Sequence, residues 1–382
     1  MASTVSVSRL SALLTLGIVV MGSNSFVLSP ILTDVASDLG TTPVVIARVI
    51  SAFGATTAIS SFTLGGMIDR VGARTVLLVG ATTMAMALVG CAVSQSWGWL
   101  ALSQAVIGSA VGVMLPAIYA AATASAPEGQ GARILGRVIS GWGISLVLGV
   151  PFSAFLTDFA GWRATFGALA IFATVALLGF FQLPRHDRTG AQAPSISSTR
   201  ALLIPGVIPL LTICLAYMTA FYGLYAFLGD HLRTTLGLSA GQAGLVVLGY
   251  GAGFGLASFA DTAVDRIGPA RIFPAVLLAI GAVYLLLIPA TQGYVSGIIA
   301  AVVWGFINHI GVNIIILLLS QTRADARGAL MGLHTATTYS SVFLGPLLLG
   351  ALYEPFGFQT VAIVAAAFLT GGSPIAWRIR KL

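Results

Sequence analysis

Long apolar stretches dominate this 382-residue sequence, and each is about the 20 residues that an α-helix needs to cross a bilayer. A membrane β-strand would be only about 10 residues long, with strict alternation of apolar and polar positions, so helices are the spanning structure that fits. The sequence therefore predicts an all-α membrane protein with twelve transmembrane helices, at residues 10–32, 43–67, 75–93, 97–122, 134–157, 162–183, 203–227, 240–262, 270–290, 294–320, 328–351 and 357–378.

The scarcity of charged residues excludes a soluble protein of this length. Charged residues make up 8% of the chain and hydrophobic residues 57%, whereas a soluble domain carries about 25% charged residues. The net charge of +7 comes from Arg residues scattered between apolar stretches, which make a poor surface for phosphate groups. We therefore expect the lipid bilayer as the surroundings of the chain, and no nucleic acid as a partner.

The residue types that enzymes and metal sites use are dispersed. Cys91 and Cys214 both lie in apolar stretches, where free thiols behave as small hydrophobic groups. The histidines show no H-E-x-x-H spacing, and no G-x-x-x-x-G-K-[ST] loop is present to bind a nucleotide. We expect a protein that is not an enzyme, has no cofactor and no metal, and acts as a monomer.

Positive charges lie on one side of the predicted membrane. If the N-terminus is cytoplasmic, all of the 18 Lys and Arg residues except Arg48, Arg163 and Arg233 fall in cytoplasmic segments. Cytoplasmic loops carry such an excess in membrane proteins. This asymmetry favours an even number of helices with both termini in the cytoplasm, in a bacterial-type inner membrane. The N-terminal segment lacks a clean cleavage site, so we interpret it as the first spanning helix.

The chain divides into two related halves. A polar segment rich in Ser, Pro and Arg predicts an N-terminal six-helix bundle over residues 1–183, a cytoplasmic linker over 184–202 and a C-terminal six-helix bundle over 203–382. Segments recur in the second half 196 residues later: Asp69-Arg70-Val71-Gly72 as Asp265-Arg266-Ile267-Gly268, and Gly136, Gly149 and Gly161 as Gly332, Gly345 and Gly357. A parallel repeat of this kind is a transporter architecture that binds its substrate near the membrane midplane, between the halves.

The repeated loop resembles a signature of the major facilitator superfamily, G-x-L-x-D-R-x-G-x-R/K. The residues that carry the resemblance are Gly65, Asp69, Arg70, Gly72 and Arg74, with Met67 in the Leu position. The second copy is degenerate, with Asp261 at the first glycine; its residues are Asp265, Arg266, Gly268 and Arg271. The resemblance implies the major facilitator fold, with two pseudo-symmetric six-helix bundles and the two loops latching the cytoplasmic side.

The fifth apolar stretch carries a second resemblance. Its segment Gly141–Pro151, with Gly143, Gly149 and Pro151, is similar to the fifth-helix signature of the drug:proton antiporter branch with twelve helices, in the form seen in arabinose-efflux-permease-like proteins. The resemblance implies an exporter whose fifth helix lies between the halves. Gln104 stands where the family has an Arg that is linked to proton coupling, which puts the usual proton route in doubt.

Polar and aromatic residues inside the apolar stretches are candidates for function, because they are costly in lipid. Asp34 is the candidate for carrying a coupling proton. Asp261 is interpreted as part of the cytoplasmic charge cluster around Asp265. The candidates for substrate binding are Asn24, Arg48, Gln104, Tyr119, Trp142, Tyr222, Tyr225, Trp304, Asn308, His309, Asn313 and His334.

Each of these candidates has an alternative structural role. Arg48 either extends to the outer interface or faces the cavity, where it binds an anionic substrate or pairs with Asp34. His309 and Asn313 share a helical face and either line the cavity or bond to neighbouring helices. The aromatic residues either stack on a substrate or pack against each other.

The sequence thus predicts a secondary active transporter that exports a small organic solute or drug by alternating access, coupled to protons. Two alternatives stay open at this point: a facilitator or an anion or metabolite exchanger without proton coupling, and a membrane receptor or sensor on the same fold. We expect the first half to supply the gate and packing surfaces, and the second to supply more of the substrate chemistry. The sequence does not give the substrate or the direction of transport.

Overall fold

The computed structural model describes residues 7–64, 67–127, 130–183 and 198–379. Over these ranges the regular structure is entirely helical, with eleven helical spans long and apolar enough to cross a membrane. The last of them, α16, contains the final two predicted spans. Its backbone bends at Gly357, where φ is 73°, and this bend separates the two spans. Each of the twelve predicted spans is therefore helical over most of its described residues, as the apolar stretches indicate.

The helices of the N-terminal half follow one another along the chain with short connections. They are α1 (Val7–Asp38), α2 (Pro43–Leu64), the short α3 (Met67–Val71), α4 (Ala73–Ala92), α5 (Trp97–Ala124), α6 (Gly131–Ile139), α7 (Gly141–Ile144), the π-helix η1 (Ser145–Gly149), α8 (Val150–Ala160) and α9 (Trp162–Phe180). The span from Arg133 to Ala160 is thus one helical rod that changes its winding at η1.

The helices of the C-terminal half repeat this order. They are the short α10 (Ser198–Ala201), α11 (Val207–Leu236), α12 (Ala240–Leu256), the 3₁₀ segment η2 (Ala257–Ala260), α13 (Asp261–Ile267), α14 (Pro269–Ala290), α15 (Tyr294–Thr322), the 3₁₀ turn η3 (Ala324–Ala326) and α16 (Arg327–Ile379). The predicted linker falls largely outside the described residues.

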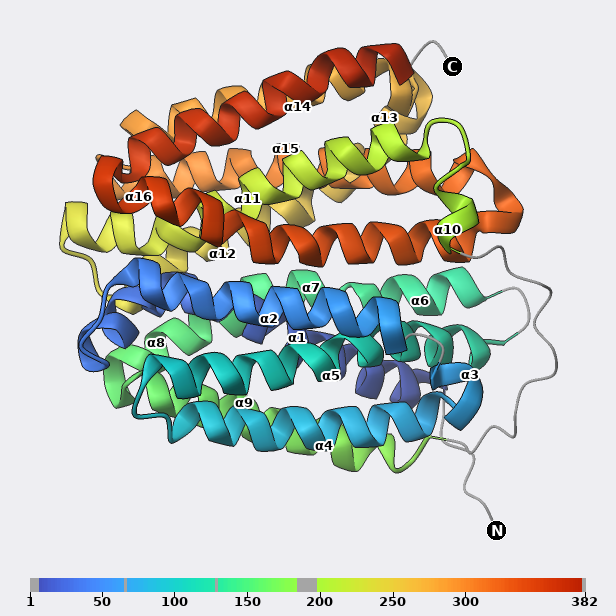
Figure 1. The fold of residues 1–382 in the computed structure, drawn as a ribbon, viewed down its shortest axis with the longest axis horizontal. Coiled ribbons are helices and arrows are strands. Elements are labelled where there is room, and N and C mark those ends of the chain that lie inside the picture. Colours follow the sequence, from blue (N-terminus) through green and yellow to red (C-terminus); the bar gives the residue numbers. More distant parts are fainter. Residues whose placement is uncertain (1–6, 65–66, 128–129, 184–197, 380–382) are drawn as a thin grey trace.

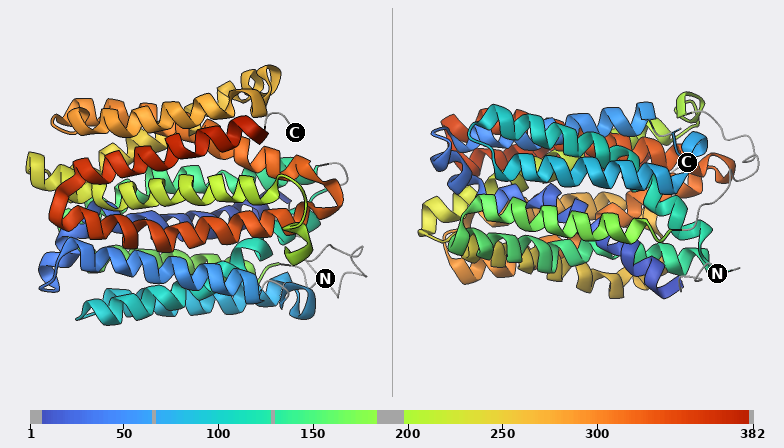
Figure 2. Two further views of the ribbon diagram at one scale, coloured as in Figure 1. Left: turned by 45° about the horizontal axis from the view of Figure 1, so that its top comes forward. Right: turned by 90° about the horizontal axis from the view of Figure 1, so that it is seen from below.

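The long helices run roughly along one axis and form two bundles that lie side by side (Figure 1). One bundle contains α1–α9 and the other α10–α16, and the start of α1 and the end of α16 lie at the same end of the molecule. We call this end the termini end and the opposite end the distal end. Further views show the same axial arrangement from two other directions (Figure 2).

The sequence repeat is also a repeat in backbone conformation. Gly72 and Gly268 have φ values of 82° and 100°, and Gly161 and Gly357 have φ values of 79° and 73°. Only glycine adopts such positive φ values without strain. The glycine pairs spaced 196 residues apart therefore form equivalent turns in the two bundles.

Glycines bring the two bundles into direct backbone contact. A Cβ added at Gly54 of α2 would lie 2.6 Å from the backbone nitrogen of Phe343 on α16, and one at Gly229 of α11 would lie 2.3 Å from the carbonyl oxygen of Ser29 on α1. A Cβ at Gly251 of α12 would lie 3.0 Å from the side chain of Leu146 in η1. A side chain at Gly54 or Gly229 would therefore displace backbone of the other bundle, and one at Gly251 would fit tightly.

The helices of the two bundles do not approach each other as closely on the termini side of these contacts. Added Cβ atoms at Gly143 of α7 and Gly255 of α12 would meet no heavy atom within 4 Å. Each of these glycines lies on the same helical rod as a close contact, but nearer the termini end. The glycine contacts between the bundles therefore lie in the middle and distal parts of these helices.

Candidate functional site

An aromatic cluster fills the space between the bundles near the middle of the helices. Phe26 of α1 packs edge-on against Trp142 of α7, with ring centroids 6.4 Å apart, and stacks on Tyr222 of α11 at 6.1 Å. Phe26 also contacts Phe221 and Tyr225, at 6.5 and 5.3 Å. The site is thus lined from both halves, by flat apolar surfaces with few polar atoms.

Two members of this cluster keep part of their surface open. Trp142 and Tyr222 are half-buried, and both pack against the hydrophobic cores of both bundles. The indole nitrogen of Trp142 donates a hydrogen bond of 3.3 Å to the hydroxyl oxygen of Tyr119. Tyr225 differs, since it is buried and its hydroxyl donates to the carbonyl oxygen of Phe26 at 3.1 Å.

The sequence alone misses the contribution of Phe26, whereas Phe221 belongs to the aromatic stripe Tyr217, Phe221, Tyr222 and Tyr225. Phe26 lies in a long apolar stretch and carries no polar atom, so the sequence gives no signal that distinguishes it from other buried phenylalanines. Only the packing of α1 against α11 brings the rings of Phe26 and Phe221 to the boundary between the bundles.

Asn24 and Gln104 bind each other inside the N-terminal bundle. The amide nitrogen of each side chain donates to the amide oxygen of the other, and both distances are 3.0 Å. Gln104 also contacts the sulfur of Cys91 at 3.7 Å, and both amide side chains are buried. Their polar groups are therefore satisfied within the protein, as burial requires.

Asn308 is likewise buried, and its side chain is hydrogen-bonded inside the C-terminal bundle. The hydroxyl of Tyr217 donates to its amide oxygen at 2.6 Å, and its amide nitrogen donates to the hydroxyl oxygen of Tyr250 at 2.7 Å. Trp304, one helical turn away on α15, is fully buried and packs against Tyr250 at 4.9 Å. These residues form an interior network behind the aromatic cluster.

A polar group of the C-terminal bundle joins α13 to α15. The imidazole Nε2 of His309 lies 3.2 Å and 3.3 Å from the two carboxylate oxygens of Asp261. Asn313, one turn further along α15, places its amide nitrogen 3.2 Å from Asp261 Oδ1 and 2.8 Å from His309 Nε2. Phe254 closes one side with its ring 4.7 Å from the imidazole.

Asp261, interpreted from the sequence as part of the cytoplasmic charge cluster around Asp265, also contacts side chains of α15. The 3₁₀ segment η2 interrupts the helix just before Asp261, whose carboxylate then binds α15. The signal in the sequence is the departure from the loop signature, which has a glycine at this position.

The distal end is held by charged groups that reach across the bundles. Arg233 of α11 forms a two-pronged ion pair with Asp34 of α1, with Nη2 2.8 Å from Asp34 Oδ1. Thr33 donates to Asp230 Oδ1 at 2.9 Å, and Tyr353 of α16 donates to Asp230 Oδ2 at 2.6 Å. We call this group the distal latch. Asp34 is thus paired with Arg233, and Arg48 has an exposed side chain on α2.

A second contact across the bundles involves the end of α8 and the start of α12. Asp158 accepts hydrogen bonds from the hydroxyl of Ser239 at 2.7 Å and from the backbone nitrogens of Ala240 and Gly241, both at 2.9 Å. A carboxylate at this position is favourable, because the first turn of a helix presents free N–H groups and the positive end of its dipole.

The loop motifs lie at the termini end. Gly65 lies outside the described residues, as does the side chain of Asp69. Arg74 donates to the carbonyl oxygen of Phe181 at 2.9 Å. Arg70, Asp265, Arg266 and Arg271 are exposed, and Gly72 and Gly268 form the turns. The role of these loops as a gate stays a prediction.

The fifth-helix motif lies against α1 and α12. A Cβ at Gly149 would lie 2.0 Å from the hydroxyl oxygen of Ser23, and one at Gly244 of α12 would lie 3.4 Å from Cα of Pro151. The π-helix η1 ends at Gly149, just before this proline. Such wide turns occur often at functional positions of helices.

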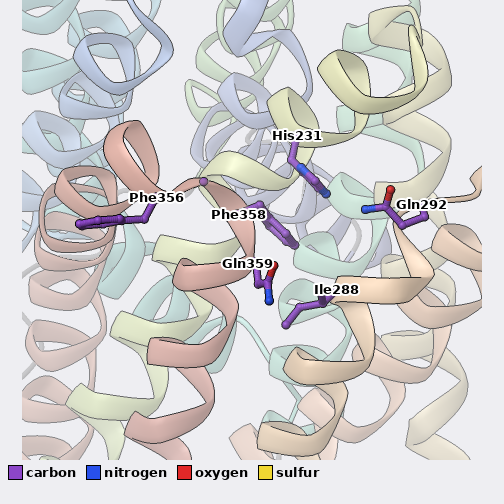
Figure 3. A pocket seen from close by; sticks show the side chains of 7 residues that line it. His231, Ile288, Gln292, Phe356, Phe358 and Gln359 are labelled. Atoms are coloured by element: carbon purple, nitrogen blue, oxygen red, sulfur yellow. The ribbon is translucent and has the colours of Figure 1, made fainter.

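A small pocket lies away from the boundary between the bundles, at the distal end (Figure 3). It has a volume of about 280 Å³. His231 stacks on Phe358 at 4.3 Å, and its Nε2 lies 3.0 Å from the hydroxyl oxygen of Thr291. The stacked imidazole therefore connects α11 to the bend of α16. His334, the remaining histidine candidate, is half-buried on α16.

Comparisons with known proteins agree with this architecture. An uncharacterized MFS-type transporter of Bacillus subtilis, YwfA, is 29% identical over 373 residues, covering 95% of this chain and 90% of the relative. A chloramphenicol resistance protein of Streptomyces lividans is 29% identical over 280 residues, covering 72% of this chain and 70% of the relative. The crystal structure of the nucleoside transporter NupG superposes with a TM-score of 0.80 at 15% identity, covering 98% of this chain and 99% of NupG.

The family model described as Major Facilitator Superfamily matches residues 14–346, which include most of both bundles. This match agrees with the all-helical fold. The chain belongs to the major facilitator superfamily of membrane transporters.

Proposed function

We propose that this protein is a proton-coupled secondary transporter that exports a small, uncharged organic solute by alternating access. The observation that carries the proposal is the uneven contact between the bundles. Gly54, Gly229 and Gly251 join the bundles in the middle and distal parts, whereas Gly143 and Gly255 meet nothing within 4 Å. Two bundles that touch at one end of a central site are in one of the two end states that alternating access requires.

The orientation of this end state supports binding of the solute from the cytoplasmic side, as export requires. The termini end carries most of the Arg residues, and cytoplasmic segments of membrane proteins carry such an excess. The termini end is therefore assigned to the cytoplasm, and the distal latch to the outer side. In this state the aromatic cluster exchanges solute with the cytoplasm.

The lining of the site supports a flat or apolar solute. Trp142 and Tyr222 are half-buried aromatic residues, and the polar groups beside them include the Trp142 indole nitrogen bonded to the Tyr119 hydroxyl. Aromatic faces bind apolar and planar groups by stacking, and few well-placed polar groups set the orientation of a ligand. The relative named as a chloramphenicol resistance protein makes chloramphenicol a suitable probe.

The proposal is tested with radiolabelled chloramphenicol in proteoliposomes with an imposed pH gradient. We expect accumulation against its concentration gradient that collapses with a protonophore. Trp142→Ala should lower the rate about two- to tenfold, since stacking on one aromatic face contributes about 0.5 to 1.5 kcal/mol and a factor of ten is about 1.4 kcal/mol. Trp97→Ala is the control, because Trp97 is exposed at the start of α5. Equal loss in both variants would contradict the assigned site.

One observation favours a second candidate, an exchanger without proton coupling. Gln104 stands at the position of the family's arginine and is fully engaged with Asn24. An exchanger would move labelled chloramphenicol against unlabelled chloramphenicol in the same proteoliposomes, but would not accumulate it in response to the pH gradient.

A further inference from the structure

We propose that Asp261 and His309 form the proton-binding site that couples protons to the movement of the bundles. This inference rests on the proposed function and identifies its coupling residues. The two side chains come from different elements of the C-terminal bundle, and the imidazole Nε2 lies 3.2 Å from Asp261 Oδ1. The Asp261 side chain is 42% exposed and that of His309 is 11% exposed, so the pair has one buried and one accessible member.

The partners of Nε2 suit both of its protonation states. When Nε2 carries a proton, it donates to the carboxylate of Asp261. When Nε2 is free of a proton, the amide nitrogen of Asn313, 2.8 Å away, donates to it instead. A neutral imidazole has one donor and one acceptor nitrogen, and an imidazolium has two donors. A ring nitrogen that faces both an acceptor and a donor can therefore gain or lose a proton and keep a hydrogen-bond partner.

The second ring nitrogen of His309 adds to this argument. Nδ1 is buried and has no hydrogen-bond partner among the described residues. A structural histidine normally has both nitrogens satisfied, and an unsatisfied buried polar group is costly. The free-energy cost of leaving Nδ1 without a partner is expected at a site whose protonation changes during function.

Few other titratable groups face this pair. Tyr217 of α11 and Tyr250 of α12 bind the neighbouring Asn308, and Tyr284 of α14 packs on Trp304. All three are phenols, which are uncharged at physiological pH. His334 is the histidine of the neighbouring α16, and Asp265, Arg266 and Arg271 lie further toward the termini end on α13 and α14. Asp261 is thus the charged group in direct contact with the imidazole.

The helix that carries Asp261 also reaches the boundary between the bundles. The spans of α12 and α13 form one rod, which the 3₁₀ segment η2 divides just before Asp261. On the distal side of this segment, Gly251 packs on Leu146 of the N-terminal bundle. A change in the hydrogen bonds of Asp261 therefore acts on the same rod that holds the two bundles together. A 3₁₀ segment within a helix is a common position for a hinge.

The test measures the conformation of the protein without any solute. Spin labels are placed at Gln95 and Gln292, which are exposed in distal loops of the two bundles, after both native cysteines are changed to alanine. Distances between the labels are measured in nanodiscs from pH 5 to pH 8.5. We expect the ratio of the two distance populations to change with pH by up to about tenfold per unit, as one proton allows.

Asp261→Asn and His309→Asn should each remove this pH dependence. Asp261→Glu should retain it, because it keeps a carboxylate at this position. The matched control is Asp325→Asn, which removes a carboxylate near the termini end of the same bundle. The Arg323 guanidinium holds the pKa of Asp325 below its usual value, so that this carboxylate stays ionised over the tested range. The control should therefore keep the response of the parent protein.

A parent protein that shows no pH response, or a response that survives in both Asp261→Asn and His309→Asn, would overturn the inference. Failure of the proposed function is a separate result, because it appears as the absence of chloramphenicol accumulation in proteoliposomes. A pH response that depends on Asp261 and His309 in a protein that does not move chloramphenicol would leave the coupling site supported and the proposed solute wrong.

Discussion

Asp34 and Asp38 lie one helical turn apart on α1 and take partners from different bundles. Asp34 pairs with Arg233 of α11, whereas Asp38 pairs with Arg163 of the N-terminal bundle, at 2.6 Å. The Arg233 side chain is 13% exposed, so its ion pair is screened much less than one at the surface. The two acids therefore allow a comparison at the scale of single residues.

Asp34→Asn should open the distal end, because it removes one partner of a charge-assisted hydrogen bond that contributes about 1.5 to 3 kcal/mol. The measurement is the rate at which an impermeant maleimide, added on the outer side of vesicles, labels a cysteine at position 222. We expect the rate to rise at least tenfold. Asp38→Asn should leave it unchanged, since its pair stays within one bundle. An equal rise in both variants would count against the distal latch.

The residues of the site were predictable to different degrees. The sequence indicates Trp142, Tyr222 and His309 as candidates because polar and aromatic groups are conspicuous in apolar stretches, and their role in function stays a prediction. The reciprocal bonds of Asn24 and Gln104 were not predictable, because the rotation of α1 relative to α5 decides whether two amides face each other or a cavity. The partner of Asp34 was missed for the same reason, since Arg233 is 199 residues away in the sequence.

Among the helices, the pairs α2–α16 and α12–η1 meet at equivalent positions of the two halves. Gly54 packs on Val342 and Phe343, while Gly251 packs on Leu146 and Val147. The two contacted segments are equivalent, because Val342 and Phe343 follow Leu146 and Val147 by 196 residues. Gly54 and Gly251 are 197 residues apart, so they are not among the glycine pairs of the repeat. The sequence does not indicate which of its many glycines make such contacts, because helix rotation and depth decide this.

Gly54→Ala should disrupt the contact between α2 and α16, because the added methyl group would lie within 2.8 Å of backbone atoms of α16. Overpacking of this kind costs about 1 to 3 kcal/mol. We expect slower chloramphenicol transport and a higher fraction of protein with an open distal end in spin-label distances. Gly255→Ala is the control, since its methyl group meets open space, and it should transport at the parent rate. Normal transport by the Gly54 variant would argue against a tight contact in the working cycle.

At the scale of the whole molecule, the chain has one end rich in Arg and one end with few Arg residues. We expect both termini on the cytoplasmic side, as the Arg distribution indicates. A green fluorescent protein fused after Leu382 should fluoresce, and alkaline phosphatase fused at the same position should be inactive in a bacterial host. The control is a phosphatase fusion after Gln95, in a distal loop, which should be active. The reverse pattern would place the distal latch inside the cell.

The overall architecture was the most predictable level of this protein. The length and number of apolar stretches determine the helices, because lipid leaves the backbone no other way to satisfy its hydrogen bonds. The repeat and the loop signature then indicate two related bundles, and the match to the family agrees. Which end of the site is closed was not predictable, since both end states use the same helices and differ in contacts between them.

The bond between Asp158 and the start of α12 has a consequence for how the bundles separate. Ser239 donates to Asp158, and it also forms a capping box with Gln242, in which each side chain accepts from the backbone of the other. If the bundles part and Asp158 withdraws, α12 keeps its own cap, so its first turn does not unwind. The helix α12 can then move as a rigid body. When the bundles come together again, Asp158 binds a first turn that is already folded.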